Sequence, residues 1–286
     1  MSPGPPAFPT WLEELPLRPG PPWVAMDIRT LDWTTWLVAD DERDRELALR
    51  AALLRDRRDE VLQINPVADA AAVESAALVD DWLARHTTPA APTTSSASPP
   101  LDQHPLEAAA RRVQEDLCVM VPIDGAYRLE AAVVCFASHW RLADKMGAPL
   151  SAIHGPVPHY ADQLARRVDT FFDRLRVERP VVRRNLSIHD HDDLLRPEPS
   201  ETFEDFDGDL DRVWLRSERQ TLVRLPSTGA VLFTIKTQQC PVTMLARVPL
   251  IAHGLAAKLR ALGADLERNG LAVHFPAVLP DWLDAT

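Results

Sequence analysis

The sequence predicts an α+β fold in which helices surround an antiparallel sheet. Two segments are rich in β-forming residues, and each contains a tight-turn signal: Asp124-Gly125 in the first and Ser227-Thr228-Gly229 in the second. Segments with apolar residues at helical spacing lie before, between and after these two hairpins. Consecutive hairpins build an antiparallel sheet, so we expect the helices to cover it from outside.

The N-terminal part of the chain divides into a proline-rich segment and two helices. Residues 1–40 are predicted to pack on the body of the protein through apolar anchors, namely Trp11, Leu12 and Trp23. Apolar residues at helical spacing between charged ones predict a helix over residues 41–64 and another over residues 69–86. Asp69 is the expected N-cap of the second helix.

A low-complexity stretch follows these helices. Residues 87–100 read TTPAAPTTSSASPP, and small residues with prolines cannot bury a core. We interpret this stretch as a flexible surface insertion within a single domain that spans residues 41–286.

The remaining elements alternate between strands and helices. In chain order, the patterns predict a helix at 107–114, a hairpin at 115–137, a short helix at 140–147 that ends at Gly147, a turn at 149–154, an amphipathic helix at 160–175, a short strand at 180–190, an acidic loop at 197–211, a hairpin at 219–239 and a helix at 244–262.

Composition excludes several classes of protein. The 31 Lys and Arg against 42 Asp and Glu give a net charge of −11, which disfavours binding to nucleic acid or anionic lipid because those partners need clustered cations. The N-terminus lacks the pattern of a secretory signal, and no run of about 18 apolar residues predicts a membrane span. The three cysteines lack paired spacing, so we expect a soluble cytoplasmic protein with reduced thiols.

One histidine stands in an unusually stiff setting. The stretch AIHGPVPHY places His154 just before Pro156 and Pro158, which fix the backbone φ near −65°. A rigidly presented imidazole is what an axial haem ligand requires. A histidine that only packs and makes one hydrogen bond is the common alternative, and the spacing alone favours it.

Other candidate ligands carry weaker signals. His139, in SHWRL, can face a pocket, although packing is the commoner role. His189 and His191, in SIHDHDD, look like a metal cluster in isolation, but two histidines two residues apart on a loop bind metal weakly, so we interpret them as a solvated turn. Cys240 is expected to be more accessible than Cys118 and Cys135, which lie in apolar strands. We find neither a glycine-rich phosphate loop nor a G-x-S-x-G motif.

Four arginines lie among apolar residues of predicted strands, where they need anionic partners: Arg183, Arg184, Arg219 and Arg224. A phosphate, haem propionates or internal carboxylates would all serve, and salt bridges within the protein are at least as common.

Several long motifs in one order point to a family. VQEDLCVM, AAVVCFASHWRLADKMGAPLSAIHGPVPHY, VDTFFDRLRVERPVVRRNLSIHD and WLRSERQTLVRLPSTGAVLFTIKT resemble the haem-dependent oxidative N-demethylases, which include the haem subunit of dimethylamine monooxygenase. The resemblance runs from about Trp36 to Leu245. It implies an antiparallel PAS-like sheet core wrapped by helices and a bound haem b.

The resemblance also implies an activity. Members of this family are monooxygenases that demethylate small secondary amines such as dimethylamine to formaldehyde and a primary amine. Their electrons come from NADPH through flavin and iron–sulfur partners on other chains or domains, in agreement with the missing glycine-rich loop and cysteine cluster here.

Residue roles follow from the positions of the motifs. The resemblance makes His154 the first choice of axial ligand, with His139, His159 and His189 as alternatives. It makes the four arginines candidates for propionate contacts and places His139 in the haem pocket. Tyr160 and Glu115 are candidates to orient the amine.

The chain departs from the family pattern at two places beside these motifs. It has His159 where the family usually has Gly before the tyrosine, and Leu186 where the family usually has Trp. Both changes can reshape the substrate pocket, so the resemblance supports haem binding more strongly than dimethylamine as the substrate. A non-catalytic PAS-like haem sensor and a haem-free scaffold therefore stay open as alternatives.

Overall fold

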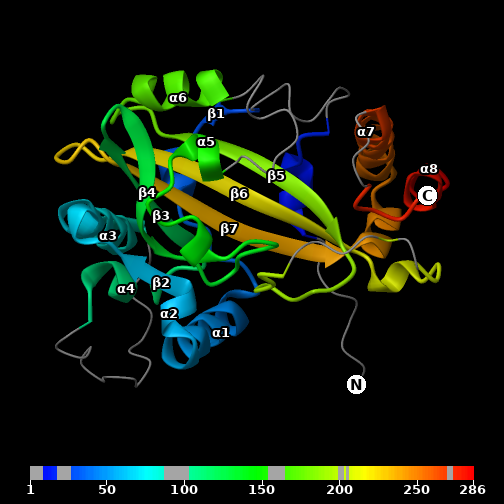
Figure 1. Ribbon diagram of the computed structural model, residues 1–286. Coiled ribbons are helices and arrows are strands. Elements are labelled where there is room, and N and C mark those ends of the chain that lie inside the picture. The colour runs from blue at the N-terminus through cyan, green and yellow to red at the C-terminus, as the bar shows by residue number, and fades with distance from the viewer. Residues whose placement is uncertain are drawn as a thin grey trace.

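A seven-stranded antiparallel sheet forms the centre of the protein (Figure 1). The computed structural model describes residues 9–17, 27–86, 103–153, 165–198, 203, 206–268 and 273–286. The strand order is β1-β5-β6-β7-β3-β4-β2. The strands are β1 (Arg29–Thr30), β2 (Leu62–Ile64), β3 (Asp116–Ile123), β4 (Ala126–Val133), β5 (Val181–His189), β6 (Trp214–Arg224) and β7 (Val231–Pro241). The predicted α+β class with an antiparallel sheet is confirmed.

Helices cover both faces of this sheet. The α-helices are α1 (Arg43–Asp56), α2 (Arg58–Val61), α3 (Asp69–His86), α4 (Pro105–Ala110), α5 (Leu150–Ile153), α6 (Ala165–Arg174), α7 (Pro249–Arg268) and α8 (Leu279–Asp284). In Figure 1, α5 and α6 lie above the sheet, α1 to α4 below it, and α7 and α8 beyond one end. None of the helices in the described ranges is long and apolar enough to cross a membrane.

The two faces of the sheet have separate cores. Leu117, Val119 and Leu232 pack with residues of α1, α3 and α4 on one face. At the far end of the same face, Leu215 and Cys240 pack with α7 and α8. The opposite face packs against α5, α6 and the 3-10 helix η4 (Leu142–Asp144). Because side chains alternate along a strand, each central strand contributes to both cores.

The N-terminal segment lies against α7 and β5. Trp11 and Leu12, in the 3-10 helix η1 (Thr10–Glu14), are buried with the α7 core. Lys258 of α7 donates from Nζ to the carbonyl of Pro16 at 2.5 Å. A Cβ added at Gly254 would lie 3.1 Å from Leu17, so glycine permits this close approach. The predicted anchor Trp23 and the insertion 87–100 lie outside the described residues.

Both predicted hairpins are present. Asp124 and Gly125 have φ of 50° and 77°, which are the two positive values that a two-residue turn of type I′ needs. Gly229, with φ of 69°, turns the chain between β6 and β7. Both strands beside Gly229 are longer than predicted: β6 begins at Trp214 and β7 ends at Pro241.

The helix predicted over residues 41–64 is interrupted at Arg57 and ends at Val61, three residues early. The chain breaks at Arg57, which has φ of −134°, and resumes as the single turn of α2. Leu62–Ile64 is the edge strand β2, paired with Ala131–Val133 of β4. Over a run as short as Leu62–Ile64, the apolar pattern cannot distinguish a helix from a strand. Pairing with β4 makes these residues a strand.

Smaller boundary errors have local causes. Asp69 has a helical φ of −50° and is the first residue of α3, not its N-cap. The predicted turn at 149–154 contains the helical turn α5. The predicted helix 244–262 is split at Val248, which is non-helical at φ −143°, because Pro249 disfavours a helical residue before it.

Candidate functional site

A polar strip crosses the sheet face that α5 and α6 share. The strand register places the polar residues of β5, β6 and β7 side by side on this face. They are Arg183 beside Gln220, Asn185 beside Glu218 and Thr237, and Ser187 beside Arg216 and Gln239. A sheet interior normally carries apolar residues, so a strip with charges of both signs marks a candidate binding surface.

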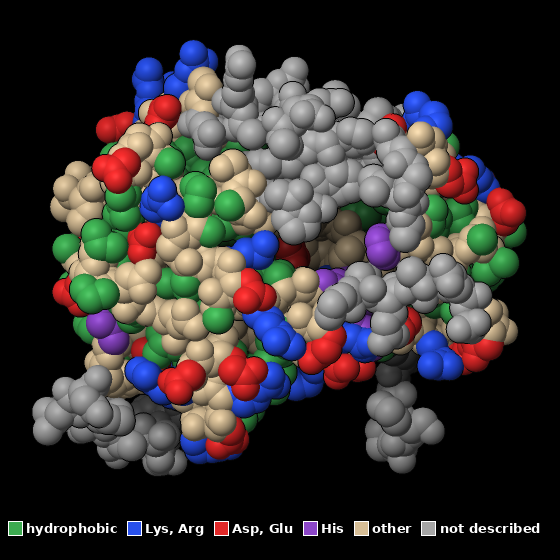
Figure 2. All heavy atoms as spheres, viewed as in Figure 1, with side chains coloured by type: hydrophobic (Ala, Val, Ile, Leu, Met, Phe, Trp, Pro, Cys, Tyr) green, Lys and Arg blue, Asp and Glu red, His purple; other side chains and the backbone are tan. Residues whose placement is uncertain are grey.

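Three histidines lie at the end of this strip. His189 is the last residue of β5, His191 follows it, and His139 comes from the chain after β4. One ring nitrogen from each lies within 4.8 Å of the other two. Figure 2 shows histidine side chains gathered beside a hollow in the face that it views. The interpretation of SIHDHDD as a solvated turn is therefore wrong, because His189 is only 5% exposed.

Hydrogen bonds hold the ring orientations of two of these histidines. His139 pairs through Nδ1 with the carbonyl of Glu198 at 3.0 Å, so Nδ1 carries the proton and Nε2 is the unprotonated nitrogen of the neutral ring. That Nε2 lies 3.3 Å from Nδ1 of His189. Nε2 of His189 lies 2.7 Å from Oγ of Ser187. The His139 and His189 rings are parallel within 3°.

The backbone brings the three histidines together from separate parts of the chain. His139 has a φ of 62°, an uncommon conformation for a residue with a side chain. Its N–H donates to the carbonyl of Arg196 at 2.7 Å, and the N–H of Arg196 donates to the carbonyl of Ala137 at 2.9 Å. The two loops that carry His139 and His191 are thereby joined.

Arg216 ties both loops to the sheet. This buried β6 side chain donates to the carbonyl of Phe136 at 2.5 Å and to that of Leu194 at 3.2 Å. Its Nε lies 3.5 Å from the carboxylate of Glu218. One guanidinium therefore connects the segment before His139, the segment after His191 and the polar strip.

The imidazoles of this group are neutral at physiological pH. Burial lowers the pKa of His189 to about 3, and the nearby Arg216 charge adds to this. Burial also lowers the pKa of His139 and of His191. Neutral imidazoles have the lone pair that a metal ion requires.

Three of the four predicted arginines already have partners within the protein. Arg184 pairs with Glu14 at 2.9 Å and donates to Gln238. Arg219 donates to the carbonyls of Thr35 and Trp36. Arg224 donates to Tyr127 Oη at 2.7 Å and to the carbonyls of Phe172, Leu175 and Gly229.

Arg183 differs from these three. Its Nε is buried and has no hydrogen-bond partner in the described part of the protein. Burial lowers the pKa of this guanidinium, and the charges of Glu218 and Asp27 oppose that shift. Because strand neighbours face opposite ways, Arg183 lies on the polar strip while Arg184 lies on the other face. Arg183 therefore keeps donor capacity for an anionic ligand.

Glu115 lies on the face opposite the histidines. Its Oε1 accepts from the N–H of Val38 at 2.7 Å, and its Oε2 is buried without a hydrogen-bond partner in the described part of the protein. Burial raises its pKa, while the charges of Lys236 and Arg219 oppose the shift. These contacts give Glu115 a role in holding the Val38 backbone, away from the polar strip.

The other predicted positions are outside the site or outside the described residues. His154, His159 and Tyr160 lie outside the described residues. Cys240, predicted to be accessible, is 2% exposed, and burial raises the pKa of its thiol to about 12. It fills a gap in the α7 core, so the prediction of an accessible thiol is wrong.

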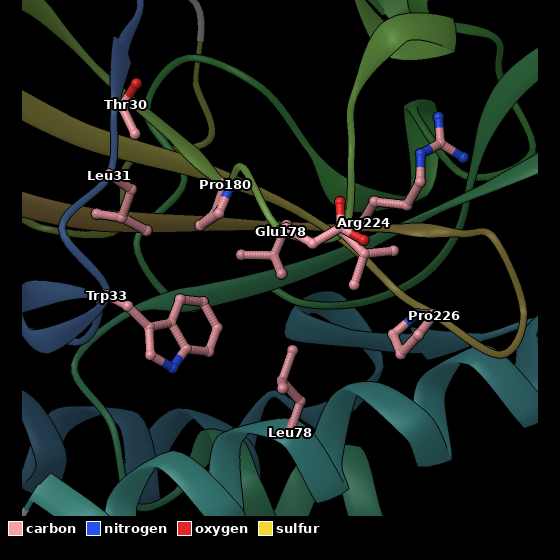
Figure 3. Close-up of a pocket in the computed structure, with 10 residues that line it drawn as sticks. Thr30, Leu31, Trp33, Leu78, Glu178, Pro180, Arg224 and Pro226 are labelled. Atoms are coloured by element: carbon pink, nitrogen blue, oxygen red, sulfur yellow. The ribbon is translucent and has the colours of Figure 1, made fainter.

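A pocket of about 320 Å³ lies elsewhere, between α3 and the start of β5 (Figure 3). Its lining is mainly apolar and includes Trp33, Leu78 and Pro180. Arg224 is the one predicted site residue in the lining, and its donors are already used. This pocket is therefore separate from the histidines and the polar strip.

The family model described as haem-dependent oxidative N-demethylase, alpha subunit-like, matches residues 27–275. The chain belongs to this family. The match covers every strand of the sheet and the three grouped histidines.

The residues present fit the haem that the family description names. A haem has an iron that takes an imidazole ligand and carboxylates that take guanidinium donors. The polar strip offers an orphaned, buried guanidinium nitrogen on Arg183 for such a carboxylate.

Proposed function

We propose that this protein is a haem-dependent monooxygenase that removes a methyl group from a small secondary amine such as dimethylamine. The observation that carries the proposal is the family match over residues 27–275. The polar strip supports it, because the buried, unpaired Nε of Arg183 can donate to a ligand with anionic groups. We further propose that residues 41–286 form one PAS-like haem-binding domain, with residues 1–40 packed on it and 87–100 as a flexible insertion.

A bound haem b would supply the oxidation. Dioxygen, two electrons from NADPH and two protons would give one oxygen atom inserted in an N-methyl C–H bond and one molecule of water. The hydroxymethyl amine formed would then separate into formaldehyde and the product amine. The electrons are proposed to come through a separate flavin and iron–sulfur reductase. The family description names an alpha subunit, which supports only the coarser inference that the chain has partner subunits.

Residues of the chain would bind the haem and orient the amine. His154 is our proposed axial ligand, with His139, His159 and His189 as alternatives, and Tyr160 is proposed to hydrogen-bond the amine. We restrict the propionate contact to Arg183, because Arg184, Arg219 and Arg224 already donate to groups of the protein. Glu115 is not carried forward as an amine contact, because it lies on the other face.

The first test is haem binding and turnover. The full chain, supplied with haem during expression, should show a Soret band and should release formaldehyde from dimethylamine when NADPH and an iron–sulfur flavin reductase are added. Bound haem without formaldehyde from any small methylamine would overturn the enzymatic proposal in favour of a sensor. A colourless protein that takes up no added haem would favour the alternative of a haem-free scaffold.

The axial ligand has its own test. If His154→Ala leaves the Soret band and the haem content unchanged, the assignment of His154 as the ligand fails.

Replacing Arg183 with glutamine should weaken haem binding about 10- to 100-fold, the loss of roughly 1.5–3 kcal/mol that a charge-assisted hydrogen bond supplies. The unfolding midpoint of the haem-free protein should change little, because the Arg183 Nε has no hydrogen-bond partner to lose within the described residues. Haem titration followed at the Soret band measures the first quantity and thermal unfolding the second.

The neighbouring arginine gives a matched control for this prediction. Arg184→Gln removes an ion pair with Glu14 on the other face, so it should lower stability and leave the haem affinity of the folded protein unchanged. Equal haem affinity in Arg183→Gln and the unmodified chain would show that Arg183 does not contact the haem.

A further inference from the structure

We propose that His139, His189 and His191 form a binding site for a divalent transition-metal ion of the zinc type, separate from the haem. The proposal rests on the arrangement of these side chains and not on the proposed oxidative activity. The site would take one ion per chain and leave a coordination position for water.

The spacing of the imidazoles suits such an ion. In a tetrahedral site with metal–nitrogen bonds of about 2.0–2.1 Å, ligand nitrogens lie roughly 3.3–3.4 Å apart. Nε2 of His139 and Nδ1 of His189 are already 3.3 Å apart. The ligand nitrogen of His191 lies within 4.8 Å of both. Two ligands therefore stand at the required distance, and the third needs to approach by up to about 1.5 Å.

The hydrogen bonds around the rings match those of metal-bound histidines. Such histidines donate their other ring N–H to an oxygen. Nδ1 of His139 faces the carbonyl of Glu198 at 3.0 Å, and Nε2 of His189 faces Oγ of Ser187 at 2.7 Å. In each ring the nitrogen left over is the one that faces the other histidine.

His191 provides independent support for a bound ion. Its side chain is 11% exposed, and its Nε2 is buried without a hydrogen-bond partner in the described part of the chain. Its Nδ1 accepts from the N–H of Asp193 at 3.1 Å. Metal binding through Nε2 moves the ring proton to Nδ1, so we expect residues 190–193 to shift when the ion binds.

The charges that face the group are mixed. Arg216, Arg196 and His274 lie on the positive side, and they act on His139 and His189. Asp190 and Asp193 lie 3.9 Å from the two nitrogens of His191. Glu218 opposes Arg216 at 3.5 Å. The aspartates and Glu218 therefore offset the arginines around an incoming cation.

The ligand types define the class of metal. Imidazole is borderline-soft and binds zinc, cobalt, nickel and copper better than calcium or magnesium, which prefer oxygen. The group contains no thiolate, so it does not favour copper(I) or iron–sulfur clusters. Three histidines with an open fourth position are the ligand set of several catalytic zinc sites.

The experiment measures zinc binding to the full chain with its purification tag removed. Competition with a chromophoric zinc chelator at pH 7.5 should give one zinc per chain with a dissociation constant of micromolar or below. His189→Ala and His191→Ala should each weaken binding at least 100-fold. His253→Ala, an exposed histidine on α7, should leave it unchanged. Circular dichroism shows whether each variant is folded. If His189→Ala does not fold, His191→Ala still tests the site.

The same proteins separate this site from the haem. Two results support a separate site. One zinc binds per chain in both the haem-free and the haem-loaded protein, and His191→Ala leaves the Soret band unchanged. Competition between haem and zinc would overturn it and assign the histidines to the haem. Zinc binding that is equal in the His253, His189 and His191 variants, or absent from the unmodified chain, would also overturn it. None of these zinc results depends on whether the chain demethylates an amine.

Discussion

Lys236→Met is expected to lower the free energy of unfolding by about 3–5 kcal/mol, the usual effect of removing one partner of a buried ion pair. Lys236 is fully buried, and its ammonium lies 2.8 and 2.7 Å from the two carboxylate oxygens of Glu46. Asp40 adds a contact at 3.2 Å. The substitution leaves Glu46, only 2% exposed, without a cation. Urea unfolding followed by circular dichroism measures the change.

The pH dependence of this variant has a defined sign. Burial raises the pKa of Glu46 even with Lys236 beside it, so loss of the lysine raises that pKa further. A carboxyl whose pKa is raised by folding stabilises the folded protein while it is protonated. That contribution to the free energy of unfolding is lost as the pH rises through the folded-state pKa. The deficit of Lys236→Met should therefore be smaller at pH 5 than at pH 8.

Two further variants control the experiment. Lys145→Met removes a partly buried lysine that donates to the carbonyl of Ile153, and it should cost far less. Lys236→Met combined with Glu46→Leu removes both charges and should recover most of the stability. If Lys236→Met unfolds within about 1 kcal/mol of the unmodified chain, the buried pair does not have the role that we assign to it.

Asp116→Ala is the second substitution with a large expected effect, again about 3–5 kcal/mol. The carboxylate is 1% exposed and accepts from the N–H groups of Cys135 and Phe136 at 2.8 and 3.0 Å. It also pairs with Arg50 at 3.0 Å. The alanine leaves a fully buried guanidinium with no carboxylate and two buried N–H groups with no acceptor.

Asp116→Asn separates the contributions to this loss. The amide oxygen can still accept one of the N–H groups, but the charge that balances Arg50 is gone, so the loss should be intermediate. Asp56→Ala on the surface of α1, where the aspartate side chain is 58% exposed, should have no measurable effect. Equal unfolding midpoints for the Asp116 and Asp56 variants would contradict the prediction.

The parts of the fold predicted correctly are those that neighbouring residues determine. The Asp124-Gly125 turn is encoded by residues that tolerate positive φ, so the first hairpin follows from a few adjacent positions. The α3 helix follows from a long apolar period. The strand β2 does not follow, because its three residues become a strand only through pairing with β4.

The candidate site could not be assembled in the same way. His139 and His189 are 50 positions apart, and no local spacing shows that they meet. Arg183 and Arg184 are adjacent and chemically identical, yet one pairs with Glu14 and the other keeps a buried Nε without a partner in the described residues. Only the strand register separates them, and the register depends on β6. The burial of His189 was not predicted, because its acidic neighbours resemble a surface turn.

The alternation of side chains along β5 limits how this protein can change in length. Adding or deleting one residue between Arg183 and His189 would turn one of the two to the opposite face and separate the arginine from the histidines. Substitutions in the strand can be absorbed one side chain at a time, but a single-codon insertion or deletion cannot. Changes in length should therefore be far less tolerated in β5 than in the loops that connect the strands.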